Sequence, residues 1–229
     1  MTERAGCGRG LPAGHGQAVE RLAIGDVWAL TASEPAGPHA AGALISRLLS
    51  AAAGGVDARG GEGLGGGAGL GARLSHDRWG RPVLIDPLTG DESRVHVSFS
   101  HRACRTWAAV ALDGRIGIDV SAEGDFAGSY PFRRVFTDGE IERALPLHGG
   151  RLPSAAARLW ASKEAAAKAL GRGFHDLDYR EVEVVDRIPA PGLLFAVRAR
   201  EATLVVLARR EGDLWLAVAT DAPERRQGH

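Results

Sequence analysis

The chain has 229 residues, 45% of them hydrophobic and 24% charged, which is ordinary for a globular protein and enough for one large domain or two small ones. Its 28 basic and 28 acidic residues cancel to a formal net charge of zero, which argues against a broad nucleic-acid-binding surface. No apolar run approaches the roughly 18 residues of a membrane span. The N-terminus also lacks the apolar core of a signal peptide, so we expect a cytoplasmic protein.

Both termini are rich in small and polar residues. Residues 1–18 are expected to form a disordered tail, and residues 222–229 are expected to fray. Because Cys7 lies in the first tail and Cys104 is the only other cysteine, we do not expect a structural disulfide. This agrees with a reducing compartment.

The first part of the chain predicts a strand, a helix and a long loop. Residues 26–32 have the apolar character of a strand. The helix is predicted over residues 39–52, where apolar residues recur at helical spacing: Leu44, Ile45, Leu48 and Leu49. Residues 54–71 then hold ten glycines in eighteen positions. We expect a flexible loop there, because no phosphate-binding P-loop pattern is present.

The middle of the chain predicts strands. Val95, Val97 and Phe99 alternate with polar residues, as in a half-buried strand. Two apolar runs follow at residues 107–112 and 115–120. Only Asp113 and Gly114 separate these runs, which predicts that they pair as a β-hairpin.

The last part predicts one long helix followed by strands. The helix covers residues 155–170, with Ser154 as its expected N-cap and Gly171 as its expected C-terminal stop. A hairpin turn is predicted at residues 211–213. Strands are predicted at residues 181–185, 193–197, 203–208 and 214–219. Since hairpins imply antiparallel pairing, an α+β fold is favoured over a doubly wound parallel sheet.

The only two lysines lie in the long helix. They are Lys163 and Lys168, among 28 basic residues in total. A lysine suits a position where a compact ammonium meets a phosphate oxygen. Trp160, Glu164 and Lys168 share one helix face. An exposed Glu–Lys pair would contribute only about 0.3–0.5 kcal/mol, but the tryptophan indicates that this face is partly covered.

Three further segments carry candidate polar groups. Asp119 lies in an apolar strand, on the side opposite to its apolar neighbours. Ser100 and His101 end the preceding strand, and Arg81 and Pro82 lie in a turn. Each alone is better explained as a surface group. Together they suit a magnesium-bound pyrophosphate, because Mg²⁺ takes one or two carboxylates plus phosphate oxygens and water, while Lys, Arg and His meet the remaining charge.

In order and spacing these segments resemble the 4′-phosphopantetheinyl transferase superfamily, in its larger monomeric type that activates nonribosomal peptide and polyketide synthases. The family's Gly-x-Asp-x-Glu strand is matched by residues 117–121, and its Trp-x-x-Lys-Glu-x-x-x-Lys helix by residues 160–168. The helix motif is the most specific match, and the resemblance runs from about residue 73 to 175. The family's Gly-[Lys/Arg]-Pro turn, Ser-His strand end and Phe-x-x-x-Glu segment are matched by residues 80–82, 100–101 and 136–140.

The resemblance implies a pseudo-dimer of two similar α+β halves, with antiparallel sheets and the active site between them. We place the halves at residues 19–116 and 117–221. It implies a monomeric, Mg²⁺-dependent holo-[acyl-carrier-protein] synthase of secondary metabolite biosynthesis. This enzyme would transfer 4′-phosphopantetheine from coenzyme A to a serine of an acyl or peptidyl carrier protein and release 3′,5′-ADP. Neither nucleic acid nor a membrane is an expected partner.

The resemblance also assigns roles to residues. Asp119 and Glu164 would hold Mg²⁺ and, with Lys168, form the catalytic set. Glu164 or a water molecule at the ion would accept the serine proton. Coenzyme A would be bound by the following residues: Arg47, Arg81, Pro82, Ser100, His101, Lys163 and Lys168.

Two departures from the family pattern predict a weakened site. Ser121 replaces the second strand carboxylate, so a water molecule would fill that ligand position. The basic cluster that the family places near the first helix is absent from residues 33–39. His39 and Arg47 are the nearest substitutes, so weak affinity for the donor is expected.

Three alternatives to an active transferase remain open. A degenerate relative would bind carrier proteins or coenzyme A without transfer. A metal-dependent nuclease or phosphohydrolase would use the same carboxylates and lysines, although zero net charge disfavours long nucleic-acid substrates. A purely structural α+β domain is the least favoured alternative, because the matching segments occur in the family's order.

Overall fold

The computed structural model describes ten segments of the chain: residues 19–24, 27–35, 37, 39–54, 72–102, 104–112, 114–171, 173–175, 177–189 and 193–221. They form an α+β fold in which all paired strands of the sheets are antiparallel, as predicted. No helix in these segments is long and apolar enough to cross a membrane. The expected terminal tails and residues 55–71 of the glycine-rich loop lie outside the described residues.

The first sheet has four strands in the order β1-β2-β6-β5. Their bounds are β1 Glu20–Ile24, β2 Val27–Pro35, β5 His96–Arg102 and β6 Arg105–Ala111. Helix α1, Ala40–Gly54, packs on the outer face of this sheet through Leu44 and Leu48. A separate two-stranded hairpin precedes β5 and consists of β3 Arg73–His76 and β4 Pro82–Ile85.

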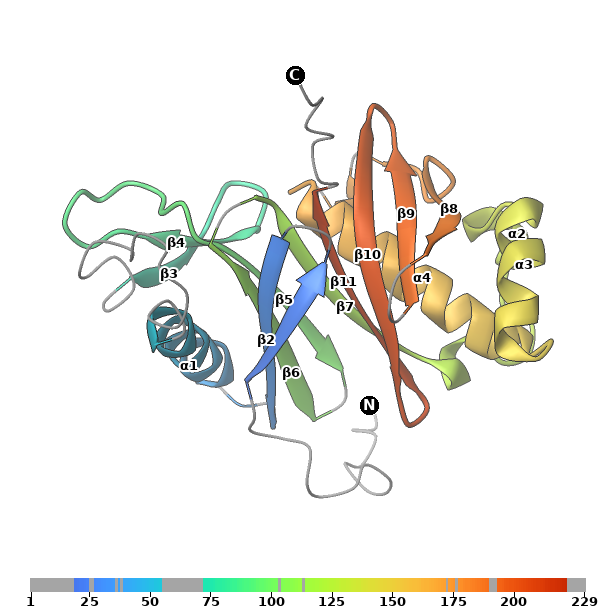
Figure 1. The fold of residues 1–229 in the computed structure, drawn as a ribbon, viewed down its shortest axis with the longest axis horizontal. Helices are drawn as coiled ribbons and strands as arrows, with labels where there is room; N and C mark the ends of the chain where they lie inside the picture. The colour runs from blue at the N-terminus through green and yellow to red at the C-terminus, as the bar shows by residue number, and fades with distance from the viewer. Residues whose placement is uncertain are drawn as a thin grey trace, which may run out of the picture.

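The second sheet has five strands in the order β7-β11-β10-β9-β8. Their bounds are β7 Ile116–Ala122, β8 Val182–Ile188, β9 Leu193–Ala199, β10 Ala202–Glu211 and β11 Leu214–Asp221. Helix α4, Leu152–Ala169, covers the outer face of this sheet (Figure 1). Short helices flank it: η2 Glu123–Phe126, α2 Phe132–Val135, α3 Asp138–Ala144, η3 Leu145–His148 and η4 Gly173–His175.

The inner faces of the two sheets share one apolar cluster, which we call the inter-sheet core. Strand β6 shows why it forms, because alternate residues of a strand face opposite sides. Trp107 and Ala109 point into the inter-sheet core, whereas Ala108 and Val110 point towards α1. The inter-sheet core is formed by Leu22, Ile24, Trp107, Ala109, Ala111, Ile116, Ile118, Val120, Ala122, Leu194, Val205, Leu214, Leu216 and Val218.

The predicted hairpin between residues 107–112 and 115–120 is wrong. Strand β6 pairs with β2 and β5, whereas β7 pairs with β11 in the other sheet. The chain therefore passes from one sheet to the other between these strands. Asp113, in the predicted turn, lies outside the described residues. Both runs are apolar enough to be buried on two faces, so their local pattern did not reveal that each had a different partner.

The long helix begins earlier than predicted. It starts at Leu152 with Arg151 as its N-cap, so Ser154 is not the cap. Ser154 is instead buried inside the first turn, where its hydroxyl accepts a hydrogen bond from Trp215 Nε1 at 3.1 Å. The predicted stop is confirmed, because Gly171 follows the helix with a φ of +76°, which favours glycine.

The remaining strand predictions agree with the structure, and the cysteine prediction does not. Strands β8 to β11 overlap the four predicted segments, and β10 and β11 form the predicted hairpin. Cys104, between β5 and β6, is disulfide-bonded, contrary to expectation. Cys7 lies outside the described residues. The division into halves at residues 116 and 117 and their pseudo-dimer relationship stay predictions.

Candidate active site

Strand β7 and helix α4 lie unusually close together because of Gly117. A Cβ atom at this position would lie 1.9 Å from the Ala165 carbonyl oxygen and 2.6 Å from the Ala169 amide nitrogen. Real Cβ atoms never approach backbone so closely, so only glycine permits this contact. The close approach brings the strand residues after Gly117 next to the polar residues of the helix.

Asp119 faces the helix, as the alternation of β7 predicted. Its neighbours Ile118 and Val120 point into the inter-sheet core. The Asp119 side chain is only 11% exposed, and its Oδ1 lies 2.8 Å from Lys168 Nζ. A buried carboxylate next to an ammonium group is stable only when it is hydrogen-bonded as well. Ser100 of β5 supplies such a bond, because its hydroxyl donates to Asp119 Oδ1 at 3.0 Å.

Two serines of β5 attach the first sheet to β7 of the second sheet. The Ser98 hydroxyl accepts from the Ile118 amide at 3.1 Å, and the Ser100 hydroxyl accepts from the Val120 amide at 3.2 Å. Ser121, which replaces the family's second carboxylate, places its hydroxyl 3.4 Å from Asp119 Oδ2. Ser100 therefore contacts both the Asp119 carboxylate and the backbone of β7, and these two bonds hold Asp119 in position.

Lys168 joins the helix to both sheets. Its ammonium donates to Asp119 Oδ1, to the Phe99 carbonyl at 3.3 Å and to the Ile118 carbonyl at 3.1 Å. These bonds use all three donors of the ammonium group. The side chain is nevertheless 29% exposed, so a bound anion can reach it.

Glu164 lies one helical turn before Lys168. The pKa of Glu164 is raised to about 7, mainly by burial and next by the nearby Asp119 carboxylate, while the Lys168 ammonium opposes this rise. The electrostatic effect of Asp119 on Glu164 shows that the two carboxylates lie near one another. The helix face shared by Trp160, Glu164 and Lys168 is thus partly covered, as predicted.

These side chains fit a magnesium ion. Mg²⁺ prefers oxygen ligands and is usually held by one or two carboxylates, with waters and substrate phosphates completing its shell. Asp119 and Glu164 would supply the carboxylates, and Ser121 would leave a position for water. The described residues contain no group of three or more His, Cys, Asp or Glu that could hold a metal. A two-carboxylate site therefore depends on substrate oxygens.

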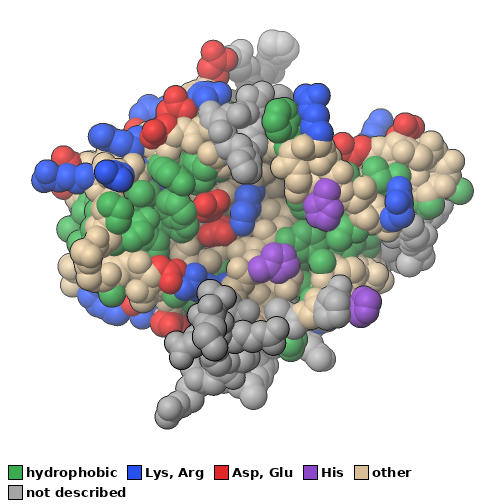
Figure 2. All heavy atoms as spheres, turned by 180° about the vertical axis from the view of Figure 1, so that it is seen from behind, with side chains coloured by type: hydrophobic (Ala, Val, Ile, Leu, Met, Phe, Trp, Pro, Cys, Tyr) green, Lys and Arg blue, Asp and Glu red, His purple; other side chains and the backbone are tan. Residues whose placement is uncertain are grey.

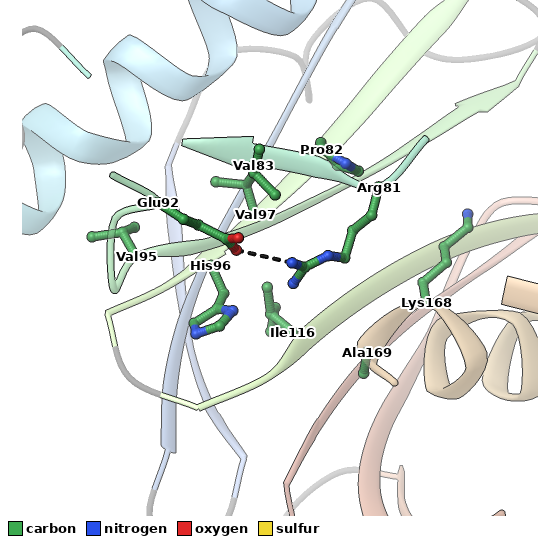
Figure 3. A pocket seen from close by; sticks show the side chains of 10 residues that line it. All are labelled: Arg81, Pro82, Val83, Glu92, Val95, His96, Val97, Ile116, Lys168 and Ala169. Atoms are coloured by element: carbon green, nitrogen blue, oxygen red, sulfur yellow. Dashed lines mark hydrogen bonds and ion pairs between the residues drawn. The ribbon is translucent and has the colours of Figure 1, made fainter. Parts of the chain in front are cut away.

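A pocket adjoins this site between the β3–β4 hairpin and the end of α4 (Figure 3). Two cations line it, Arg81 and Lys168, together with Glu92 and His96. Its apolar walls are Pro82, Val83, Val95, Val97, Ile116 and Ala169. The pocket thus combines residues of both sheets, of the hairpin and of the helix, and its charged groups favour an anion.

Two carboxylates hold Arg81 in this pocket. Arg81 Nε lies 3.1 Å from Asp77 Oδ2, and Nη2 lies 2.9 Å from Glu92 Oε1. Asp77 also accepts from the Trp79 and Arg81 amides, which closes the turn before β4. Burial raises the pKa of Asp77, but these hydrogen bonds outweigh burial and keep it below its ordinary value.

Lys163 lies away from this pocket. It is fully buried, with its ammonium 2.9 Å from the Glu140 carboxylate, also fully buried, and bonded to the carbonyls of Val135 and Tyr179. Glu140 in turn accepts from the Thr137 and Val184 amides. The geometry corrects the expectation that Lys163 lies beside the donor, because burial and these contacts leave its ammonium no access to a ligand. The Phe-x-x-x-Glu match supplies the partner of this lysine.

Other predicted residues lie outside the pocket. His101 is exposed on β5, with Nδ1 2.9 Å from the Thr106 hydroxyl, and Arg47 is half-buried on α1. Of the predicted donor-binding residues, only Arg81, Pro82 and Lys168 line the pocket. Sequence reasoning missed Asp77, Glu92 and His96. No motif marks them, although an acid four residues before Arg81 was a possible signal for a turn.

An aromatic group lies beside the site. Trp160 packs against Phe174 and Tyr179, with ring centroids 5.9 and 5.2 Å apart. Tyr179 is 38% exposed. Seen from behind the view of Figure 1, the molecule gathers hydrophobic side chains on one part of its surface, next to acidic and basic side chains near the middle of that view (Figure 2).

Comparison with known proteins shows a family resemblance over the part of the chain that contains this site. The chain is of the mixed α+β class, with a strand carboxylate, a helix carboxylate and a lysine at the contact between β7 and α4. Residues 115–219 match the family model described as the 4′-phosphopantetheinyl transferase superfamily. This region, a little under half of the chain, contains Asp119, Glu164 and Lys168, so the predicted resemblance to the superfamily holds there.

Curated relatives resemble shorter segments of the chain. The holo-[acyl-carrier-protein] synthase of Gloeobacter violaceus is 43% identical over 58 residues, which are 25% of this chain and 43% of that protein. The enzyme of the same name from Carboxydothermus hydrogenoformans is 40% identical over 62 residues, 27% of this chain and 49% of the relative. The holo-[acyl-carrier-protein] synthase of Streptococcus suis is 25% identical over 87 residues, which are 38% of this chain and 64% of that protein. The chain spans about half the length of these relatives.

Proposed function

We propose that this protein transfers 4′-phosphopantetheine from coenzyme A to a serine of a carrier protein. The observation that carries the proposal is the Asp119–Lys168 ion pair, with Glu164 near enough to feel both charges, beside a pocket with a second cation, Arg81. The superfamily match and the relatives named holo-[acyl-carrier-protein] synthase support the same reaction. The presence of two sheets, with the matched region covering β7 to β11, supports the larger monomeric type.

In this proposal Asp119 and Glu164 hold Mg²⁺, which would neutralise charge on the pyrophosphate of coenzyme A. Lys168 and the Ser100 hydroxyl bind Asp119 Oδ1 and hold the carboxylate in its orientation. Arg81 binds a phosphate of the donor in the pocket. Positioning and charge neutralisation supply most of the rate enhancement, because phosphoryl transfer demands little covalent work from the protein.

The acceptor serine forms a bond to the β-phosphorus, and the bond to 3′,5′-ADP breaks. Glu164 or a water molecule at the ion would accept the serine proton. Lys168 balances the charge that develops on the leaving oxygen, exchanging one of its carbonyl contacts for it. The carrier protein docks on the aromatic surface of Trp160, Phe174 and Tyr179, which begins one helical turn from Glu164.

Mass spectrometry of an apo-carrier protein tests the proposal. The carrier is incubated with the protein, coenzyme A and Mg²⁺, and we expect a mass gain of one phosphopantetheine on its serine. Asp119→Ala and Glu164→Ala are expected to abolish this gain while circular dichroism shows a retained fold. A normal mass gain with Glu164→Ala would contradict the assigned role of that residue.

The same experiment separates the alternatives. Binding of coenzyme A by the wild-type protein without any carrier modification would identify a binding module. Release of inorganic phosphate or cleavage of nucleic acid without a carrier would identify a phosphohydrolase or nuclease. Repeating the assay in EDTA tests the metal requirement, and we expect no transfer until Mg²⁺ is restored.

A further inference from the structure

We propose that Glu92 is a resident counter-ion of Arg81 that competes with the incoming phosphate and so sets the affinity for the donor. This inference rests on the proposed function, since it concerns the same pocket. It assigns Glu92 and Asp77, two acids bound to one guanidinium, opposite effects on donor binding.

Glu92 faces into the pocket. It lines the cavity together with Arg81, and its Oε1 lies 2.9 Å from Arg81 Nη2, one of the two outer nitrogens of the guanidinium (Figure 3). Its backbone is fixed by a bridge to Ile85 at the end of β4. Its side chain remains 45% exposed, so it can leave the guanidinium without breaking other contacts.

Asp77 lies outside the pocket lining and has a different position on the guanidinium. Its Oδ2 binds Arg81 Nε, while Oδ1 accepts the amides of Trp79 and Arg81. Gly171 lies on the other side, where an added Cβ would lie 3.3 Å from Arg81 Cδ. Asp77 therefore holds the stem of the side chain in a fixed direction through Nε and does not itself occupy the two outer nitrogens.

The competition follows from the charges in the pocket. Arg81, Lys168 and His96 line the pocket together with Glu92, which is the single acid among the described residues of the lining. A phosphate that binds Arg81 bidentately must displace Glu92 from Nη2 or lie next to its negative charge. Breaking the Glu92–Arg81 ion pair then makes the net free energy of phosphate binding less favourable. Removal of the Glu92 charge is therefore expected to strengthen phosphate binding.

Calorimetric titrations with coenzyme A and with inorganic pyrophosphate test this inference. Glu92→Gln is expected to lower the Kd for both ligands about two- to fivefold, the range that corresponds to an exposed ion pair. In the transfer assay the KM for coenzyme A falls while kcat stays unchanged. Asp77→Asn keeps the turn acceptor but loses the charge at Nε, and it is expected to raise the Kd about two- to fivefold.

Glu183→Gln is the matched control. Glu183 also pairs with arginines, Arg143 and Arg198, but lies on β8 at the opposite edge of the second sheet from β7. The Glu183→Gln substitution removes the same charge and is expected to leave the Kd values for coenzyme A and pyrophosphate unchanged. An unchanged or weaker affinity in Glu92→Gln overturns the inference, and so does equal strengthening in the control.

The two ligands distinguish failure of the inference from failure of the proposed function. If the wild-type protein transfers phosphopantetheine but Glu92→Gln leaves the affinities unchanged, the proposed function holds and the competition by Glu92 does not. A wild-type protein that transfers nothing lacks the proposed function, and the pyrophosphate titration then still decides whether Glu92 competes for Arg81.

Discussion

Two lysines five residues apart on one helix have different surroundings. Lys168 lies at the surface of the β7–α4 contact with Asp119, and Lys163 lies in the core with Glu140. Five residues rotate a helix by about 140° from the starting direction, so the two side chains leave the helix on different sides. The same residue type therefore serves the proposed site in one position and the stability of the fold in the other.

Lys163→Met is expected to destabilise the protein by about 3–5 kcal/mol, because it leaves the Glu140 carboxylate buried without its cation. Urea denaturation measures this loss, and the KM for coenzyme A should not change. The double variant Lys163→Met/Glu140→Gln should recover part of the stability. A raised KM with unchanged stability would instead support a direct role of Lys163 in donor binding.

His148 gives the stability a pH dependence. Burial, and next the Arg158 guanidinium, lower the pKa of His148 to about 4, and its Nε2 accepts from Arg158 Nε at 2.9 Å. Since the unfolded chain binds this proton more readily, the contribution of His148 is complete above about pH 6.5 and is lost as pH falls through 4. We expect a loss of about 1–2 kcal/mol between pH 7 and 4, after allowance for partial exposure.

The measurement compares unfolding free energies of the wild-type protein and His148→Gln at pH 7 and 4. Other carboxylates titrate in both proteins, so the difference between the two proteins isolates His148. The variant should lose less stability on acidification. An identical pH dependence in both proteins would show that the His148–Arg158 contact does not control acid stability.

At the scale of elements, the contact between β7 and α4 decides where the site forms. Gly117 allows the close approach, and the alternation of the strand then places Asp119 against the helix. The serines of β5 add the third element, since they bind amides of β7. Gly117 is thus needed for the close packing that places the Asp119 carboxylate, two residues later, against the helix.

Gly117→Ala is expected to destabilise the protein by about 3 kcal/mol or more, because overpacking against backbone atoms forces the strand and helix apart. Gly42→Ala in α1 is the control, since an added Cβ there meets nothing within 4 Å. That variant should be slightly more stable, because alanine favours a helix. Thermal unfolding of both variants checks the prediction, and a soluble Gly117→Ala protein with wild-type stability would contradict it.

At the scale of the whole molecule, the inter-sheet core makes the two sheets depend on one another. Residues of both sheets contribute to it, including Trp107 from the first and Ile118 and Leu216 from the second. The pocket likewise draws its residues from both parts. A protein built in this way should unfold in one cooperative transition.

Residues 115–221 produced alone are expected to aggregate, although they contain the complete region matched to the superfamily. Removal of the first sheet would expose the apolar inner face of the second, and large exposed apolar patches promote association. Size-exclusion chromatography and dye binding measure this outcome. A monodisperse, folded monomer would show that the second sheet does not need the first.

The sequence by itself determined the local elements and the chemistry of the site. Helical spacing located α4, strand alternation placed Asp119 opposite to Ile118, and the motif selected Glu164 and Lys168. These signals are local, because each depends on residues within two helical turns or one strand. They also predicted the pairing of β10 with β11, where a short turn leaves no other partner within reach.

Only the tertiary structure decided which elements met. In the structure β6 and β7 belong to different sheets, and Lys163 forms an ion pair with Glu140. Glu92 and Asp77 both form ion pairs with Arg81. These partners lie up to about a hundred residues apart along the chain, as β7 and β11 do. Pairing at such distances depends on which apolar faces can be buried together, and that is a property of the whole molecule rather than of any short segment.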